Sequence, residues 1–229
     1  MLFGVVVLLC SANVLAEDAK PPRIKVAVLA PTGQTDTLKI WQGFKMLLED
    51  ALKTYEVELM PVTIEQFQKI AINNEADLLL GNQTAFLSVF SEVNVRWLAT
   101  LERNSASFNP NSFIGSAIIV RHDSQIKTLK DLKDKKVSAV SKDALGGFLL
   151  GYKQIYEAGL EAPKDYFVTF SGYPIERGLF YLSNQSVDAA IVPTCLYERM
   201  VKKNEISAQE FIVLEPIATV DGCMSSTPL

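Results

Sequence analysis

The sequence predicts an α/β protein of two lobes, each a mainly parallel sheet with flanking helices, joined by a hinge. Segments such as Ile24–Ala30 are almost continuously apolar, as strands inside parallel sheets are. They alternate with segments whose apolar residues recur at helical spacing, and this β-α rhythm is typical of a parallel sheet covered by helices. After two extended segments the rhythm begins again near residue 136, which indicates a second lobe.

The first β-α series ends near residue 90. Its strands are expected at residues 24–30, 57–62 and 76–80. The helix after the first strand carries an apolar face of Ile40, Phe44, Leu47, Leu48 and Ala51, with Trp41 beside it. Thr63 and Gln66 have the spacing of a capping box and therefore begin a second helix, and a third follows the loop at 81–84.

The second series follows two extended strands, at residues 95–101 and 113–120. Thr128 caps a short helix at 129–132. The remaining strands are expected at 136–140, 167–170, 187–192 and 211–214, and the helices between them at 144–158, 174–183 and 195–203. We assign residues 20–116 and 195–229 to the first lobe and residues 117–194 to the second.

Composition and net charge narrow the range of possible functions. The chain has 229 residues, 48% of them hydrophobic, and a net charge of −4, which suits one large domain or two small ones. The mild acidity, with no Lys/Arg cluster among aromatic residues, argues against nucleic acid as a partner. No HExxH, CxxC, P-loop or GxGxxG occurs, so neither a metal nor a nucleotide cofactor is expected.

Residues 1–16 have the features of an export signal. Leu2–Leu9 is an apolar run too short to span a bilayer comfortably, and Val14 and Ala16 occupy the −3 and −1 positions of a cleavage site. We therefore expect a signal peptide cut after Ala16 and a periplasmic protein. A short membrane anchor is the alternative.

Two cysteines, Cys195 and Cys223, follow the expected cleavage site. In an oxidising compartment such a pair favours a disulfide. The alternatives are a redox-sensitive pair and an enzyme in which Cys195 is a nucleophile at a helix start, with Glu198 one turn away. The one histidine, His122, lies in a polar stretch and is expected at the surface, so no catalytic residue is assigned.

The stretch from Thr128 to Phe148 predicts an anion site. A strand is followed by a helix whose first turn contains Asp143, Gly146 and Gly147. Small residues there leave the N–H groups at the positive end of the helix dipole accessible. The alternative is that the glycines only let helix and strand pack closely. Ligands in open α/β sheets bind at the carboxyl ends of strands. The residues so placed are Thr32, Gly33, Asn82, Gln83, Thr84, Ser141, Leu145, Gly146, Gly147, Tyr173 and Thr194.

Three segments resemble the type II periplasmic solute-binding proteins. Residues 124–137 follow the pattern Ser-x-Ile-x-x-Leu-x-Asp-Leu-Lys-x-Lys-x-Val, and Phe170–Gly172 and Val187–Ala190 match further family segments. The resemblance covers roughly residues 24–215 and favours the phosphonate-binding branch. It implies a two-lobed binding protein without enzymatic activity that closes on a small solute.

Within that superfamily the chain departs from the phosphonate binders. Ala144–Gly147 stands where they have Ser-Thr-Ser-Gly, and Tyr173-Pro174 stands where their Gly-x-His continues. The Gly-Gly-Phe run and residues 192–198 instead resemble the periplasmic sensor domains of tetrathionate-sensing histidine kinases. The resemblance thus implies a small anionic solute and one of two partners, an ABC permease or a membrane sensor kinase. A third possibility is a sensor fragment that acts only through protein contacts.

Overall fold

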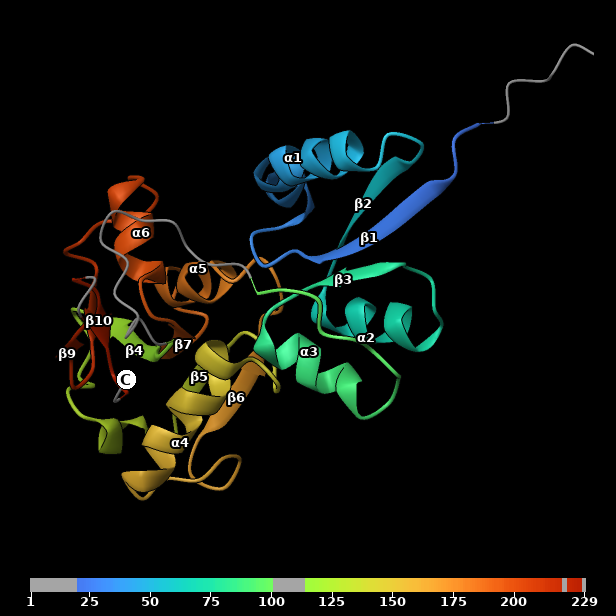
Figure 1. Ribbon diagram of the computed structural model, residues 1–229. Coiled ribbons are helices and arrows are strands. Elements are labelled where there is room, and N and C mark those ends of the chain that lie inside the picture. The colour runs from blue at the N-terminus through green and yellow to red at the C-terminus, as the bar shows by residue number, and fades with distance from the viewer. Residues whose placement is uncertain (1–19, 101–113, 220–221, 228–229) are drawn as a thin grey trace, which may run out of the picture.

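The structure is a computed structural model that describes residues 20–100, 114–219 and 222–227. It contains two lobes (Figure 1), one around strands β1 to β3 and one around β4 to β8. The predicted two-lobed α/β architecture is confirmed. The expected signal peptide lies outside the described residues. Within them, no helix is long and apolar enough to cross a membrane.

The first lobe alternates strand and helix along the chain. Its elements are β1 (Arg23–Leu29), α1 (Gln34–Ala51), β2 (Glu56–Val62), α2 (Ile64–Ile72), β3 (Leu78–Leu80) and α3 (Gln83–Phe90). The three strands are parallel, in the order β2-β1-β3. Helix α1 covers one face of the sheet, while α2 and α3 cover the other (Figure 1).

Local sequence explains how these helices begin and pack. The predicted capping box at α2 is present: Gln66 N donates to Thr63 Oγ1 at 3.3 Å, and Thr63 N donates to Gln66 Oε1 at 2.9 Å. The apolar face expected on α1 is wrong in part, because Ile40 and Leu47 are 64% and 65% exposed. Trp41, with Phe44 and Leu48, packs on the sheet instead.

The second lobe has a larger sheet. Its strands are β4 (Ser116–Arg121), β5 (Lys136–Ala139), β6 (Phe167–Phe170), β7 (Ala189–Pro193) and β8 (Phe211–Val213). Their order is β6-β5-β7-β4-β8, with β4 antiparallel to both of its neighbours. Its helices are a 3₁₀ turn (Leu129–Leu132), a π-helical turn (Leu145–Leu149) that continues into α4 (Leu150–Glu157), α5 (Arg177–Ser183) and α6 (Leu196–Lys202).

The segment after residue 195 differs from the expected lobe assignment. We expected residues 195–229 to return to the first lobe, but β8 pairs with β4, and Leu196 and Met200 of α6 lie in the core of the second lobe. Strands β9 (Ile217–Ala218) and β10 (Met224–Ser225), which the sequence did not predict, form a short hairpin.

The described tail also packs on the second lobe. Ser226 N donates to the carbonyl of Ser116 at 2.8 Å, and Ile118 N donates to Ser226 Oγ at 2.9 Å. The buried hydroxyls of residues 225–227 therefore bond to backbone groups along the edge of β4. Since β4 begins at Ser116, this residue also belongs to the second sheet rather than to the first lobe.

Two strand predictions in the first lobe also differ from the structure. β3 begins at Leu78 rather than at Ala76, because Asp77 uses its side chain to bind the N–H of Lys25. The strand expected at 95–101 is absent over its described part, residues 95–100, which pair with no other described strand.

Candidate functional site

Among the described residues, the loop after β6 is a place where the two lobes meet. Ile175 N donates to the carbonyl of Pro31 at 2.8 Å. A Cβ atom built on Gly33 would lie 3.5 Å from Cγ of Pro174. The expected site residues Thr32 and Gly33, at the end of β1, thus lie beside the end of β6.

Tyr173 lies at this junction. Its ring packs against the first lobe's core cluster, which includes Leu29 and Phe67. Burial, with a smaller contribution from the negative charge of Glu65, raises the pKa of Tyr173 to about 12. The phenol therefore remains protonated at neutral pH and can donate a hydrogen bond.

A second group of expected site residues gathers at the end of β5. Val140 N donates to the carbonyl of Gly147 at 3.0 Å, and Gly172 N donates to the carbonyl of Val140 at 2.9 Å. The helix start and the loop after β6 therefore flank the same strand end, which continues into Ser141. This arrangement agrees with the rule that ligands bind at the carboxyl ends of strands.

Ser141 carries an unused hydroxyl. The residue is 7% exposed, and its Oγ has no hydrogen-bond partner among the residues that the structure describes. Buried hydroxyls are nearly always hydrogen-bonded, so an orphaned one needs an explanation. A ligand oxygen would supply the missing partner.

The helix start next to Ser141 provides backbone donors. The helix begins at Leu145, and Ala144 at its N-cap makes no side-chain capping bond. The first N–H groups of a helix have no partner within the helix, so those of the first turn remain available to an anion.

Gly146 and Gly147 also have a packing role. A Cβ atom on Gly146 would lie 2.8 Å from the carbonyl oxygen of Gly115, and one on Gly147 would lie 2.6 Å from Cγ2 of Val140. Real Cβ contacts are not this short, so both positions require glycine for the helix to approach the sheet. The two glycines therefore do allow helix and strand to pack closely, as the packing alternative expected. Their N–H groups can still face a ligand.

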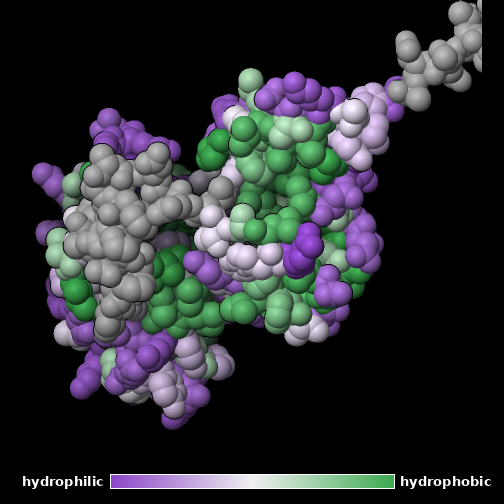
Figure 2. All heavy atoms as spheres, in the orientation of Figure 1, coloured by the Kyte–Doolittle hydropathy of each residue, from purple (hydrophilic) through white to green (hydrophobic). Residues whose placement is uncertain are grey.

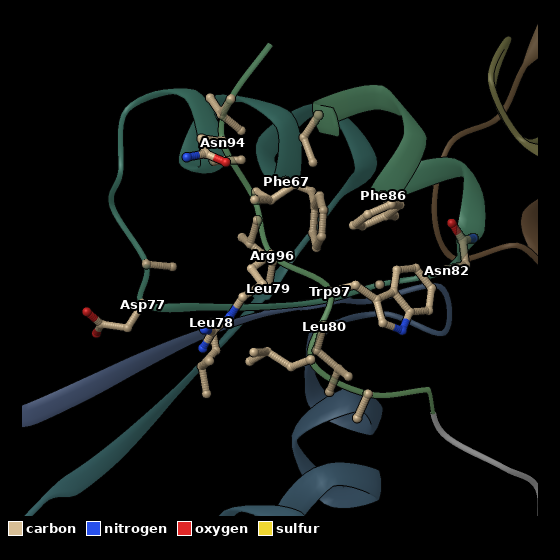
Figure 3. Close-up of a pocket in the computed structure, with 18 of the residues that line it drawn as sticks. Phe67, Asp77, Leu78, Leu79, Leu80, Asn82, Phe86, Asn94, Arg96 and Trp97 are labelled. Carbon is tan, nitrogen blue, oxygen red and sulfur yellow. The ribbon is translucent and has the colours of Figure 1, made fainter. Parts of the chain in front are cut away.

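The remaining expected residues are more scattered. Thr194 contacts the same Gly115 as the helix start, because its N donates to the Gly115 carbonyl at 3.1 Å. Asn82 instead caps α3, accepting a bond from Ala85 N at 2.9 Å. Asn82 and Gln83 line a cavity of about 850 Å³ within the first lobe (Figure 3), and Thr84 follows them in α3.

Sequence reasoning missed Arg177. This first residue of α5 donates from Nη1 to the carbonyl of Ser171 at 2.7 Å. The same nitrogen would lie 3.8 Å from a Cβ on Gly172. The guanidinium of Arg177 therefore places a positive charge beside the end of β6, where it would attract an anion. The sequence signal was a basic residue at a helix start that directly follows a strand-end loop.

The cysteines form the expected disulfide. Cys195 and Cys223 are bonded, with their Cα atoms 5.1 Å apart. A sulfur in a disulfide cannot act as a nucleophile. The bonded form of the protein therefore does not support the alternative of an enzyme with Cys195 as its nucleophile. The bond fastens the tail to the second lobe, because Cys195 precedes α6. In the described part of the chain no group of His, Cys, Asp or Glu has the arrangement of a metal site.

Comparison with known proteins identifies relatives of two kinds. Residues 26–224 match the family described as ABC transporter, phosphonate, periplasmic substrate-binding protein. The chain is 33% identical over 221 residues to the tetrathionate sensor histidine kinase TtrS of Salmonella typhimurium. That match covers 96% of this chain and 37% of the kinase, so the chain spans little more than a third of the kinase's length.

Two solved structures share the fold. The binding protein of an ABC phosphonate transporter from Pseudomonas aeruginosa superposes with a TM-score of 0.67 at 17% identity, over 85% of this chain and 64% of that protein. PhnD1 from Prochlorococcus marinus, solved with methylphosphonate, gives 0.66 at 18% identity, over 85% and 72%. The matched family and the Pseudomonas structure are both described as substrate-binding components of ABC transporters.

Proposed function

Because this chain belongs to the family of periplasmic substrate-binding proteins of phosphonate ABC transporters, we propose that it binds a small anion between its lobes. The observation that carries the proposal is the orphaned hydroxyl of Ser141 beside an uncapped helix start. The proposed donors are Ser141 Oγ, the N–H groups at Leu145–Gly147, and the guanidinium of Arg177.

The lobe contacts support a closing mechanism. The second lobe contributes the helix start and the positive charge, and the first lobe contributes Thr32 and Gly33, which lie beside the loop that contains Tyr173 and Pro174. A ligand that touches both sets gains contacts only in the closed state, and that differential affinity is what drives hinge closure. Each helix terminus aimed at an anion contributes about 0.3–1 kcal/mol, and charge-assisted bonds contribute more.

We propose sensing as the biological role. The support is the relative covering 96% of this chain at 33% identity, which is a sensor histidine kinase named for tetrathionate. The ligand class that fits is a small oxyanion of sulfur or phosphorus. Delivery to an ABC permease is the second candidate, favoured by the family match over residues 26–224. Adjacent genes separate the two roles, since a response regulator indicates sensing and a permease with an ATPase indicates uptake.

Calorimetric titration tests the site. We would titrate the protein with tetrathionate, methylphosphonate, sulfate and a neutral sugar, and we expect at least one oxyanion to bind while the sugar does not. Ser141→Ala should weaken that binding about tenfold, the effect of losing one hydrogen bond of roughly 1.4 kcal/mol. Because the hydroxyl has no described protein partner, the same substitution should leave thermal stability unchanged or higher.

Two further variants test whether anion binding depends on this site or on net charge alone. Arg177→Gln should weaken binding about 10- to 100-fold, the usual range for a charged hydrogen-bond donor. Lys142→Ala removes an exposed charge next to Ser141 and is the matched control, with little expected change. Equal losses in Lys142→Ala and Arg177→Gln would show that net charge, rather than this site, attracts the anion. Full affinity in Ser141→Ala would remove Ser141 from the site.

A further inference from the structure

The helix that begins at Leu145 starts with a wide turn. Leu149 N donates to the carbonyl of Ala144 at 3.0 Å, and Leu150 N donates to that of Leu145. Both bonds reach five residues back along the chain, whereas those of an α-helix reach four, so the turn is π-helical. Such turns are rare and occur frequently at functional sites. A contact from outside the helix is expected to keep this one from tightening.

The hydroxyl of Ser116 provides that contact. It donates to the carbonyl of Gly146 at 2.6 Å and accepts a bond from Gly151 N at 3.0 Å. These glycines are also five residues apart, so the hydroxyl joins the next pair of the wide turn by standing between its donor and its acceptor. Both glycines are buried. Without the hydroxyl, their two polar groups would lose their partner at a considerable cost in free energy.

Ser116 is itself held in place by its backbone. The residue begins β4 and is fully buried. Its N–H donates to Thr227 Oγ1 at 3.0 Å, and its carbonyl accepts bonds from Ser226 N at 2.8 Å and from Ser225 Oγ at 3.2 Å. The N–H, the carbonyl and the hydroxyl of Ser116 are therefore all occupied, which fixes the hydroxyl relative to the sheet.

The wide turn changes which N–H groups are free at the helix start. In an α-helix with Ala144 at its N-cap, the Ala144 carbonyl would accept Phe148 N. Here Leu149 N takes the acceptor that Phe148 N would otherwise use. The N–H of Phe148 is thereby released and joins those of Leu145–Gly147, which precede the first bonded turn.

We propose that Ser116 is a positioning residue of the anion site: its hydroxyl holds the turn open, and the open turn presents Phe148 N as a fourth backbone donor. This inference rests on the proposed function, since it concerns the same helix start. That start lies beside Ser141, whose carbonyl accepts Ala144 N at 3.1 Å. An anion needs several donors to replace its hydration, so one donor more or less should change its affinity.

The Ser116→Ala variant tests the proposal, because a methyl group cannot bridge the two glycines. The turn should then tighten, with Leu150 N bonded to the Gly146 carbonyl and Phe148 N bonded to the Ala144 carbonyl. In the absence of anion, NMR should show the Phe148 amide exchanging roughly ten times more slowly than in the unmodified protein, since it gains a hydrogen bond. A substitution that merely destabilised the helix would make exchange faster, so the direction of the change separates positioning from a purely structural role.

The same variant should bind the anion more weakly. We would titrate the unmodified protein and Ser116→Ala with tetrathionate, methylphosphonate and sulfate. The anion that binds should lose about tenfold or more in affinity, the effect of losing one charge-assisted hydrogen bond. In the unmodified protein, saturation with that anion should slow exchange of the Phe148 amide.

Two further variants are the controls. Ser116→Thr keeps the hydroxyl and should restore both the fast exchange of the Phe148 amide and the affinity for the anion. Ser138→Ala removes another fully buried hydroxyl of the same sheet, one that has no hydrogen-bond partner among the residues that the structure describes. It should therefore change neither measurement.

The proposal would be overturned by faster exchange of the Phe148 amide in Ser116→Ala, or by equal losses of affinity in Ser116→Ala and Ser116→Thr. The titrations also separate it from the proposed function. If none of the three anions binds the unmodified protein, the proposed function fails and this inference fails with it. If an anion binds the unmodified protein and Ser116→Ala equally well, only the role of Ser116 is refuted.

Discussion

Strands β3 and β7 occupy equivalent positions in the two lobes, because each directly follows an aspartate that bonds to a backbone N–H of a neighbouring strand, but their surroundings differ. Four of the five residues of β7 are fully buried, while all three of β3 are only partly buried. The same contrast extends to the following segments, because Phe211 of β8 is buried whereas Trp97 and Leu98 are exposed. Hydrophobic side chains consequently remain on the surface of the first lobe (Figure 2), among them Leu87 and Phe90.

This contrast shows how one supersecondary unit depends on its neighbours. Burial contributes about 25 cal/mol for each Å² of apolar surface removed from water, so the lobe that contains β7 gains more from folding. The proposed ligand donors at Ser141 and Arg177 both lie in that better-packed lobe. We therefore expect the second lobe to be the more stable one, and substitutions at matched positions can test this difference.

The largest effect should come from the disulfide. Replacing both Cys195 and Cys223 by serine opens a link across 28 residues, which should cost about 3–4 kcal/mol of unfolding free energy through the unfolded chain's entropy. Hydrogen exchange followed by mass spectrometry should show faster exchange in peptides from β4 to β8. Peptides from β1 to β3 serve as the control and should not change. Equal loosening of both lobes would mean that they unfold as one unit.

A matched pair of glycines should give the next largest effect. A Cβ on Gly151 of α4 would lie 2.5 Å from Cγ2 of Ile191, whereas one on Gly43 of α1 would meet nothing within 4 Å. Gly151→Ala should therefore destabilise by about 1–3 kcal/mol through overpacking. Gly43→Ala should stabilise by up to about 1 kcal/mol, because alanine is the better helix former.

Urea unfolding monitored by circular dichroism measures both glycine variants. The two substitutions are chemically identical, so opposite signs can arise only from their surroundings. A destabilising Gly43→Ala would indicate that α1 is covered by something other than solvent.

Local sequence signals predicted most elements, and long-range pairing explains the failures. The β-branched run of β1 and the Thr63–Gln66 spacing specify structure by themselves, and both predictions were correct. The apolar pattern of α1 predicted a face that includes Ile40 and Leu47, but the face that contacts the sheet contains Trp41. Nothing local indicates that residues 225–227 bond to β4, because polar residues become buried only when a distant backbone offers partners.

Only part of the candidate site can be compared with the sequence expectation. Strand ends could be located, and the structure brings Ser141 and the helix start, both expected site residues, together at the end of β5. The role of Asn82 as a helix cap is a local feature, because its side chain bonds to the N–H of a residue three positions later. The contact of Arg177 with the Ser171 carbonyl depends instead on how the loop after β6 folds.

The equivalence of the aspartates can be tested directly. Asp77→Ala and Asp188→Ala each remove one bond to a backbone N–H at 2.8 Å. Each should cost roughly 1 kcal/mol of unfolding free energy, the usual net value of a hydrogen bond at such a position. Exchange should accelerate in the lobe that carries the substitution and stay constant in the other. A loss from only one substitution would contradict the equivalence of β3 and β7.

The smallest effect concerns pH and compares one capping residue from each lobe. In the second lobe the carboxylate of Asp131 accepts bonds from the N–H groups of Lys127 and Thr128 at 3.0 and 2.8 Å, and these bonds lower its pKa. A lowered pKa in the folded state means that the unfolded chain binds the proton more readily. The resulting stabilisation is complete above the ordinary carboxyl pKa of about 3.9 and is lost as the pH falls below it. In the first lobe the corresponding acceptor is the amide of Gln66, which does not titrate.

Acid unfolding of two variants separates these caps. Asp131→Asn should be less stable than the unmodified protein at pH 6 and should approach it as the pH falls toward 2, because protonation removes the same charge. Gln66→Ala should lower stability by a similar amount at both pH values, since its bond to Thr63 N carries no charge. Urea midpoints of each variant and the unmodified protein at pH 6, 4 and 2 provide the measurement. A constant difference for Asp131→Asn across that range would show that the carboxylate's charge has no part in the cap. In that case the caps of the two lobes would be energetically alike, and their different chemistry would have no consequence for stability.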